Sequence, residues 1–144
     1  MSGFLLDTNI LSETRRPRPD AKVLAFLKSK PASELFVSSV TFAEIRFGIE
    51  MISEPARRAE LTDWFEFRLR PEFSERILPV SEDVMVRWRM LVEDGRRIGH
   101  TFSQPDLIIA ATALQFGLTL VTRNTEDFVK TRVALINPWR DQGA

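Results

Sequence analysis

The chain has 144 residues, of which 44% are hydrophobic and 28% charged, and its 20 Lys and Arg residues balance its 20 Asp and Glu residues. This composition predicts one globular domain with an ordinary core and excludes a disordered chain, while the zero net charge gives no argument for a nucleic-acid or membrane partner. The absence of Cys and the single His exclude disulfides and any zinc site that needs several thiolate or imidazole ligands.

The first third of the chain alternates short apolar runs with helical patterns. The N-terminus carries neither a basic segment nor a long apolar run, so we expect no signal peptide, no membrane span and a cytoplasmic protein. Residues 3–6 predict a buried strand, residues 7–9 turn the chain, and an arginine- and proline-rich loop follows at 15–19. Apolar residues recur at helical spacing over 20–30, and 35–38 predict a second strand.

The same alternation continues to the C-terminal tail. A helix capped by Ser39 or Thr41 is expected to reach Ile52. Pro79 cannot donate to a strand ladder, which favours an end or edge position for the strand that contains it. The other patterns predict, in chain order, a helix at 55–69, a strand at 77–80, a helix at 81–95, a helix at 103–117, and strands at 118–122 and 133–136.

Short apolar strands that alternate with longer helices are typical of an α/β fold. We predict a central parallel sheet of four to five strands with helices on both faces, in a single domain over residues 1–144. In such sheets, ligands bind outside the carboxyl ends of the strands. Asp7 and Thr122 each end a predicted strand, and Glu44 lies in what we expect to be the first turn of a helix. The fold should therefore gather these distant residues at one edge of the sheet.

Asp106 stands at the start of a small-residue helix that is apolar on every side. Ser103 can cap this helix, Pro105 fits its first turn, and the helix dipole favours an ionised carboxylate at Asp106. Three carboxylates at one sheet edge would raise one another's pKa, and a hard divalent cation such as Mg²⁺ or Mn²⁺ would relieve this conflict. Because such ions assist displacement at phosphorus, the residues predict a metal-dependent phosphodiesterase site.

Four motifs and a tail occur in order along the chain, and they read LLDTN (5–9), VSSVTFAEIRFG (37–48), DLIIAATA (106–113), VTRN (121–124) and INPW (136–139). Together they resemble the PIN domain of VapC-type toxins, and the tail resembles the FitB-like branch of that group. The resemblance implies a PIN-like fold and the toxin half of a type II toxin–antitoxin pair, a Mg²⁺-dependent endoribonuclease in which Mn²⁺ can substitute. It also implies an RNA substrate, a cognate VapB/FitA-like antitoxin, a homodimer, and a heterotetramer or larger assembly with the antitoxin.

The resemblance also implies roles for individual residues. Asp7, Glu44 and Asp106 match the acidic residues that hold metal and position the attacking water. Many members of the group have a fourth acidic residue where this chain has Asn124, so Asn124 or the nearby Asp127 is expected to complete the metal site. The residues expected to bind substrate are Thr8, Asn9, Thr122 and Arg123.

Several positions also have simpler or different interpretations. Asp7 could cap only the turn that follows it, and Glu44 could pair with Thr41 in a capping box. The basic loop at 15–19 could bind RNA phosphates or form a solvated surface. A phosphatase that attacks through an aspartate would need a second Asp where this chain has Asn9. The last alternative is a weakly active or inactive PIN domain that binds RNA or the antitoxin.

Overall fold

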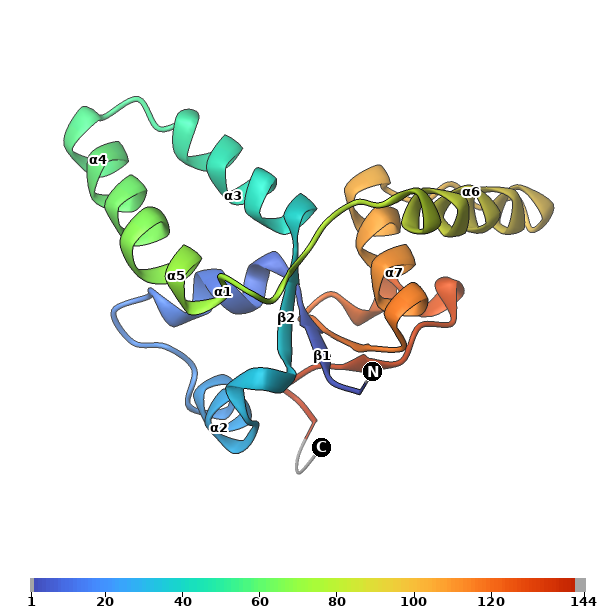
Figure 1. The fold of residues 1–144 in the computed structure, drawn as a ribbon, viewed down its shortest axis with the longest axis horizontal. Coiled ribbons are helices and arrows are strands. Elements are labelled where there is room, and N and C mark those ends of the chain that lie inside the picture. The colour runs from blue at the N-terminus through green and yellow to red at the C-terminus, as the bar shows by residue number, and fades with distance from the viewer. Residues whose placement is uncertain (1, 142–144) are drawn as a thin grey trace.

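Five parallel strands form a single sheet at the centre of the fold (Figure 1). The computed structural model describes residues 2–141. The strands are β1 (Phe4–Leu6), β2 (Leu35–Ser38), β3 (Ile77–Leu78), β4 (Thr119–Val121) and β5 (Leu135–Ile136), and they lie in the order β3-β2-β1-β4-β5. The prediction of an α/β fold with a parallel sheet of four to five strands is therefore confirmed.

Helices connect the strands. The α-helices are α1 (Thr8–Thr14), α2 (Ala21–Ser29), α3 (Ser39–Glu50), α4 (Pro55–Trp64), α5 (Arg70–Glu72), α6 (Glu82–Arg97) and α7 (Gln104–Phe116). A π-helix, η2 (Phe65–Leu69), joins α4 to α5, and short 3-10 helices occur at η1 (Ala32–Glu34), η3 (Thr125–Asp127) and η4 (Val129–Thr131). Within residues 2–141, no helix combines the length and the apolar composition that crossing a bilayer requires.

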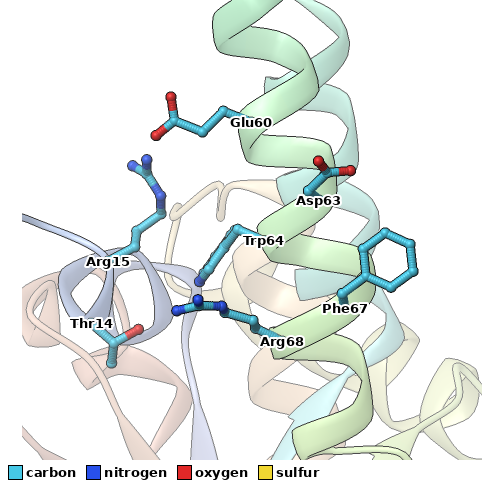
Figure 2. A pocket seen from close by; sticks show the side chains of 7 residues that line it. All are labelled: Thr14, Arg15, Glu60, Asp63, Trp64, Phe67 and Arg68. Carbon is cyan, nitrogen blue, oxygen red and sulfur yellow. The ribbon is translucent and has the colours of Figure 1, made fainter.

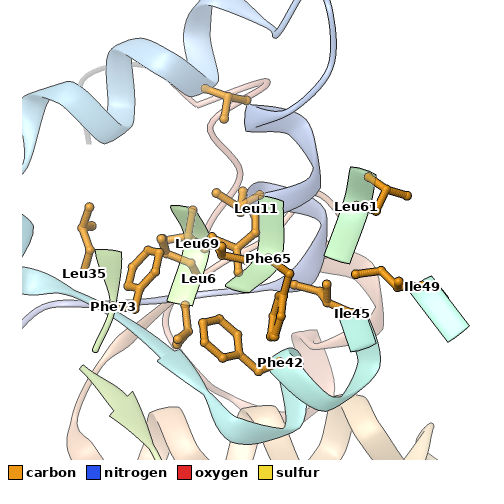
Figure 3. Packing of buried hydrophobic residues seen from close by; sticks show 14 of the residues in the cluster. Leu6, Leu11, Leu35, Phe42, Ile45, Ile49, Leu61, Phe65, Leu69 and Phe73 are labelled. Atoms are coloured by element: carbon orange, nitrogen blue, oxygen red, sulfur yellow. The ribbon is translucent and has the colours of Figure 1, made fainter. Parts of the chain in front are cut away.

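Neighbouring residues of the central strand direct their side chains to opposite faces of the sheet. Leu6 packs with buried residues of α1, α2, α3, α4 and η2, whereas Leu5 packs with those of α6 and α7. Figure 1 shows these two groups of helices on either side of the sheet. In the first group, the rings of Phe42 and Phe65 meet edge to face with centroids 5.0 Å apart (Figure 3). Burial of a side chain such as Phe65 stabilises the fold by about 1.5–3 kcal/mol.

The strand order reverses beside β1. The chain places β2 and β3 on one side of β1 and then crosses to place β4 and β5 on the other side. In open α/β sheets, such a switch point leaves a crevice at the carboxyl ends of the two central strands. Leu6 of β1 pairs with Val121 of β4, so the next residues, Asp7 and Thr122, emerge side by side at this crevice.

Several helix and strand boundaries differ from the sequence prediction. Ser38 caps α3 by accepting a 3.0 Å hydrogen bond from Val40 N, so the expected caps at Ser39 and Thr41 were wrong. Glu44 consequently lies in the second turn of α3, not the first, and cannot form the capping box with Thr41. The helix expected at 55–69 changes to a π-helix at residue 65, and the strand expected at 77–80 ends at 78, on the edge of the sheet as its Pro79 predicted.

Candidate active site

Asp7 is a buried carboxylate with a fixed orientation. Its side chain is 5% exposed and caps α1, because Asp7 Oδ1 accepts a 2.8 Å hydrogen bond from Thr8 N. The other oxygen, Oδ2, accepts a 2.8 Å hydrogen bond from the Thr122 hydroxyl. Its backbone N–H continues the sheet by donating to Val121 O at 3.0 Å. The same side chain therefore both caps α1 and contacts Thr122 at the end of β4.

The Thr122 hydroxyl is the centre of a small network beside Asp7. It accepts hydrogen bonds from Asn9 Nδ2 at 3.2 Å and from Asn124 N at 3.1 Å while it donates to Asp7. The Asn9 side chain in turn accepts a 3.2 Å hydrogen bond from Arg123 N. This network brings together Asp7, Asn9, Thr122 and Arg123, which the sequence had singled out. The neighbouring Thr8 hydroxyl is buried and has no hydrogen-bond partner within residues 2–141.

Two further carboxylates come from helices that begin at the same edge of the sheet. Asp106 lies in the first turn of α7 and is half-buried, and Glu44 on α3 is exposed. Ser103 occupies the N-cap position of α7, but its side chain makes no capping hydrogen bond to the helix backbone.

The pKa values of the three carboxyl groups are all raised from their ordinary values. For Asp7, burial is the main cause, the hydrogen bonds from Thr122 and Thr8 oppose it, and the charge of Asp127 adds to it. For Glu44, which is exposed as a residue, partial desolvation of the carboxyl is the first cause, followed by repulsion from Asp7 and Asp106. For Asp106, burial is followed by repulsion from Asp7 and Asp127, and a hydrogen bond with Ser103 opposes them. The expected mutual repulsion therefore exists, but desolvation is the larger effect.

Asp127, which the sequence offered as a substitute for a fourth acid, is electrostatically part of this cluster. Its charge raises the pKa of both Asp7 and Asp106. It also lines a cavity of about 370 Å³ together with Asp106, Glu126, His100 and Lys130. Asn124 contributes its backbone N–H to the Thr122 hydroxyl instead. Of the two candidates, Asp127 is the one whose charge acts on the cluster.

The donor set suits a hard divalent cation by its chemistry. Carboxylate oxygens are the ligands that Mg²⁺ and Mn²⁺ prefer, and a bound cation would offset the repulsion that raises these pKa values. In the present rotamers, however, no three such side chains within residues 2–141 converge on a common point that could hold an ion. The side chains of Glu44 and Asp106 would have to turn toward Asp7 to complete a site.

A larger cavity lies away from the acidic cluster. It has a volume of about 600 Å³ and opens between the end of α1 and the face of α4 and η2 (Figure 2). Arg15 lies over the Trp64 ring with its Cζ 5.5 Å from the ring centroid, and Phe67 is 76% exposed at the cavity. An adjoining groove of about 380 Å³ shares Thr14, Trp64 and Arg68 with this cavity. Apolar residues from several elements form most of its lining, among them Leu24 and Leu27 of α2 and Leu69 of η2.

Sequence reasoning missed Asn137 and Trp139 as parts of the site's surroundings and noted them only as a tail motif. Asn137 is 5% exposed, and its Nδ2 donates a 3.3 Å hydrogen bond to the carbonyl of Arg123. The guanidinium of Arg123 stacks over the Trp139 ring, 5.0 Å from its centroid, and makes no ion pair within residues 2–141. An Asn before a Pro, directly after the last predicted strand, is the signal that could have pointed to this turn.

Comparisons with known proteins agree with this geometry. A protein-family model described as PIN domain matches residues 4–133. The chain is 36% identical over 138 residues to Toxin FitB of Neisseria gonorrhoeae, which covers 96% of this chain and 99% of that protein. It is 33% identical over 136 residues to VapC ribonuclease Y4jK of Sinorhizobium fredii, covering 94% and 97% of the two chains. The crystal structure of FitAcB from Neisseria gonorrhoeae superposes with a TM-score of 0.89 at 36% identity, covering 96% of this chain and 99% of that chain.

Proposed function

The chain belongs to the PIN-domain family, and on this basis we propose that it is the toxin of a type II toxin–antitoxin module, an endoribonuclease that hydrolyses RNA phosphodiester bonds with Mg²⁺. The observation that carries the proposal is the cluster of Asp7, Glu44 and Asp106 at the switch point of the sheet, with all three pKa values raised. The relatives named as a toxin and as a VapC ribonuclease are matched over almost their whole length. We further propose that residues 1–144 form one PIN domain.

The proposed catalytic and metal-binding residues are Asp7, Glu44 and Asp106. Asp7, fixed by its hydrogen bonds to Thr8 and Thr122, supplies a ligand whose position does not depend on the substrate. Glu44 and Asp106 would hold the ion together with Asp7 and would orient the attacking water. Mg²⁺, or Mn²⁺ in its place, would lower the repulsion among the carboxylates and stabilise the charge that develops on the phosphodiester. Asp127 is the proposed fourth acid, and Asn124 supports the site through its backbone.

The residues expected to bind substrate divide into two kinds by their contacts. The side chains of Asn9 and Thr122 form hydrogen bonds with Asp7, with Arg123 N and with each other. These contacts support a role in positioning Asp7. Arg123 is exposed and unpaired within residues 2–141, so its guanidinium can meet an RNA phosphate or base. The Thr8 hydroxyl, buried without a partner among the described residues, is available to a ligand of Asp7.

The proposed partner is a cognate antitoxin of the VapB/FitA type. The cavity at Phe67 and the adjoining apolar groove form a continuous surface that an antitoxin segment can cover, and an Arg from that segment would be attracted by the acidic cluster. Exposed apolar residues one turn apart support a homodimer: Phe47 with the C-cap Met51 at the end of α3, and Val86 with Met90 on α6. Two toxins and their antitoxins would then form a heterotetramer or larger assembly in the cytoplasm, where the RNA substrate is found.

Growth of a bacterial host that expresses the chain without its antitoxin tests this function. The wild type should stop growth, Asp7→Asn should not, and co-expression of an antitoxin encoded beside the gene should restore growth. Glu75→Gln is the matched control, because this exposed carboxylate precedes β3 at the opposite end of the sheet from the cluster. If Asp7→Asn stops growth as strongly as the wild type, toxicity does not come from catalysis at this site.

A further inference from the structure

Another cleft, separate from the cavities described above, lies on the Arg123 side of the acidic cluster. It has a volume of about 480 Å³ and separates the loop after α1 from the turn after β5. Its lining residues are Glu13, Arg16, Pro17, Arg18, Asp20, Arg123 and Trp139. The cleft is connected to the cluster through a short chain of hydrogen bonds, from Arg123 N to Asn9, from Asn9 to Thr122, and from Thr122 to Asp7. Arg123, which lines the cleft, directly follows Thr122 in the chain, so the cleft adjoins the residues that contact Asp7.

One wall of the cleft is a stack that the surrounding structure holds in place. Asn137 links the backbones of Arg123 and Trp139. Its Nδ2 donates a hydrogen bond to Arg123 O at 3.3 Å, and its Oδ1 accepts one from Trp139 N at 2.9 Å. Asp141 fixes Asn137 in turn by accepting its backbone N–H at 2.8 Å. Trp139 also packs against the core on the α1 side of the sheet. These bonds fix the backbones of Arg123 and Trp139, and the Arg123 guanidinium lies over the indole ring.

The opposite wall of the cleft carries arginine side chains whose positive charge is only partly neutralised by ion pairs within residues 2–141. The Glu13 carboxylate accepts Asp20 N at 2.8 Å and pairs with Arg16 at 3.4 Å, and the Asp20 carboxylate caps α2. Arg18 and Arg123 make no ion pair within the described part of the chain. Arg16 has a side chain that is 61% exposed, so it can reach a second anion beside Glu13. Across both walls, the cleft is lined by three guanidinium groups (Arg16, Arg18 and Arg123) and two carboxylates (Glu13 and Asp20), which leaves one positive charge in excess.

We propose that this cleft binds one unpaired nucleotide of the RNA, next to the phosphodiester that is cut. The inference rests on the proposed ribonuclease function. The base would stack on the Arg123–Trp139 pair, and a backbone phosphate would lie between Arg16 and Arg18. Aromatic rings and guanidinium planes stack on every base, and they reach a base only when it is splayed out of a helix. The cleft therefore selects single-stranded segments or loops over continuous duplex and has little preference among bases.

Fluorescence of Trp139 tests this subsite without any need for cleavage. The protein would be freed of antitoxin and carry Asp106→Asn, so that RNA stays intact, and Trp64→Phe with Trp88→Phe, so that Trp139 is the only indole. Titration with a short unpaired RNA oligonucleotide should quench its emission to saturation. Adding Arg123→Gln should raise the dissociation constant for RNA about tenfold, the size expected for loss of a stacking partner. Arg18→Gln should lower the salt dependence of binding by about 0.7 in log–log slope.

Controls separate the subsite from general electrostatics and from the proposed function. Arg89→Gln, on α6, removes one exposed positive charge elsewhere and should leave RNA binding unchanged. Arg123 is exposed, so its substitution should leave the melting temperature near that of the parent. In the catalytically intact chain, Arg123→Gln should also raise KM for cleavage.

Three results would overturn the subsite. One is unchanged Trp139 emission while labelled RNA saturates the protein. Another is an Arg123→Gln variant with unaltered Kd and KM, which would leave the nuclease standing without this cleft. The third is quenching of Trp139 emission by purified antitoxin when RNA causes no quenching. A wild type that cuts no RNA would contradict the ribonuclease, whereas quenching of Trp139 by RNA would still support the subsite.

Discussion

The hydroxyl of Thr122 donates a 2.8 Å hydrogen bond to the carboxylate of Asp7, two residues that are 115 positions apart in sequence. The bond joins the ends of β1 and β4 at the point where the strand order reverses. It lowers the pKa of Asp7 against the larger effect of burial, and it holds one carboxylate oxygen in a fixed direction. The hydroxyl therefore favours the ionised form of a buried acid and fixes its orientation.

Removing that hydroxyl should weaken both stability and catalysis. Thr122→Val keeps the shape of the side chain but leaves Asp7, Asn9 and the backbone N–H of Asn124 without their shared partner. We expect a loss of about 1–3 kcal/mol in the free energy of unfolding and at least about a tenfold loss in kcat/KM. Denaturant unfolding and cleavage assays measure the two effects. Thr122→Ser retains the hydroxyl, so its unfolding free energy and kcat/KM should lie close to those of the wild type. If Thr122→Val gives the same two values as the wild type, the role assigned to the hydroxyl is contradicted.

Neutralising one acid should stabilise the metal-free protein while it abolishes cleavage. The pKa of Glu44 in the folded chain is raised above its ordinary value of 4.5, so the folded state holds its proton longer than the unfolded state does. The wild type therefore loses stability as pH rises from the ordinary pKa through the raised one. Glu44→Gln should have a higher melting temperature than the wild type above this window and no advantage below it.

Thermal melts across pH, in EDTA and in Mg²⁺, check that expectation. Mg²⁺ should stabilise the wild type more than Glu44→Gln and so narrow or reverse the difference between them. A Glu44→Gln protein that is less stable than the wild type in EDTA at neutral pH would contradict a repulsive acidic cluster.

The pH dependence of cleavage should vary with the Mg²⁺ concentration. Mg²⁺ binds ionised carboxylates, so protons compete with it. The pKa values of Asp7, Glu44 and Asp106 are all raised, so this competition begins above the ordinary values of 3.8 and 4.5. At low Mg²⁺, activity should fall as pH is lowered, and saturating Mg²⁺ should move the fall to lower pH. A profile that does not move with Mg²⁺ would show that these carboxylates are not the metal ligands.

Asp127 should matter more to metal binding than Asn124 does. The charge of Asp127 acts on both Asp7 and Asp106, whereas Asn124 supplies a backbone N–H that Asn124→Ala retains. We expect Asp127→Asn to weaken the apparent Mg²⁺ affinity about tenfold and Asn124→Ala to have a smaller effect. Cleavage rates measured against Mg²⁺ concentration give both affinities. The reverse order would restore Asn124 as the residue that completes the site.

The strands and the positions of the two Asp residues could be predicted because local signals determine them. Asp7 directly follows an apolar run, and Asp106 follows a Ser and a Pro that mark a helix start. Glu44 was predicted at the correct edge but one turn too early, since Ser38, Ser39 and Thr41 are all competent caps and only the backbone decides among them. The cap is Ser38 because the strand ends there in an extended conformation.

The contacts between distant residues could not be predicted from local patterns. The Thr122–Asp7 hydrogen bond depends on strand register, and the Asn137 bridge to Arg123 depends on how the tail returns to the sheet. Burial as the main cause of the raised pKa values also depends on packing, so the sequence suggested only repulsion. The π-helix at 65–69 has no signal in a pattern that otherwise continues α4.

Cleavage of a total tRNA and rRNA pool tests the central claim most directly. Wild type and Asp106→Asn, both freed of antitoxin and shown to be folded, would be compared in Mg²⁺ and in EDTA. The account predicts discrete cuts by the wild type in Mg²⁺ alone, and none by Asp106→Asn under either condition. Cuts that persist in excess EDTA, or that Asp106→Asn makes as well as the wild type, would contradict a metal-dependent nuclease centred on Asp7, Glu44 and Asp106.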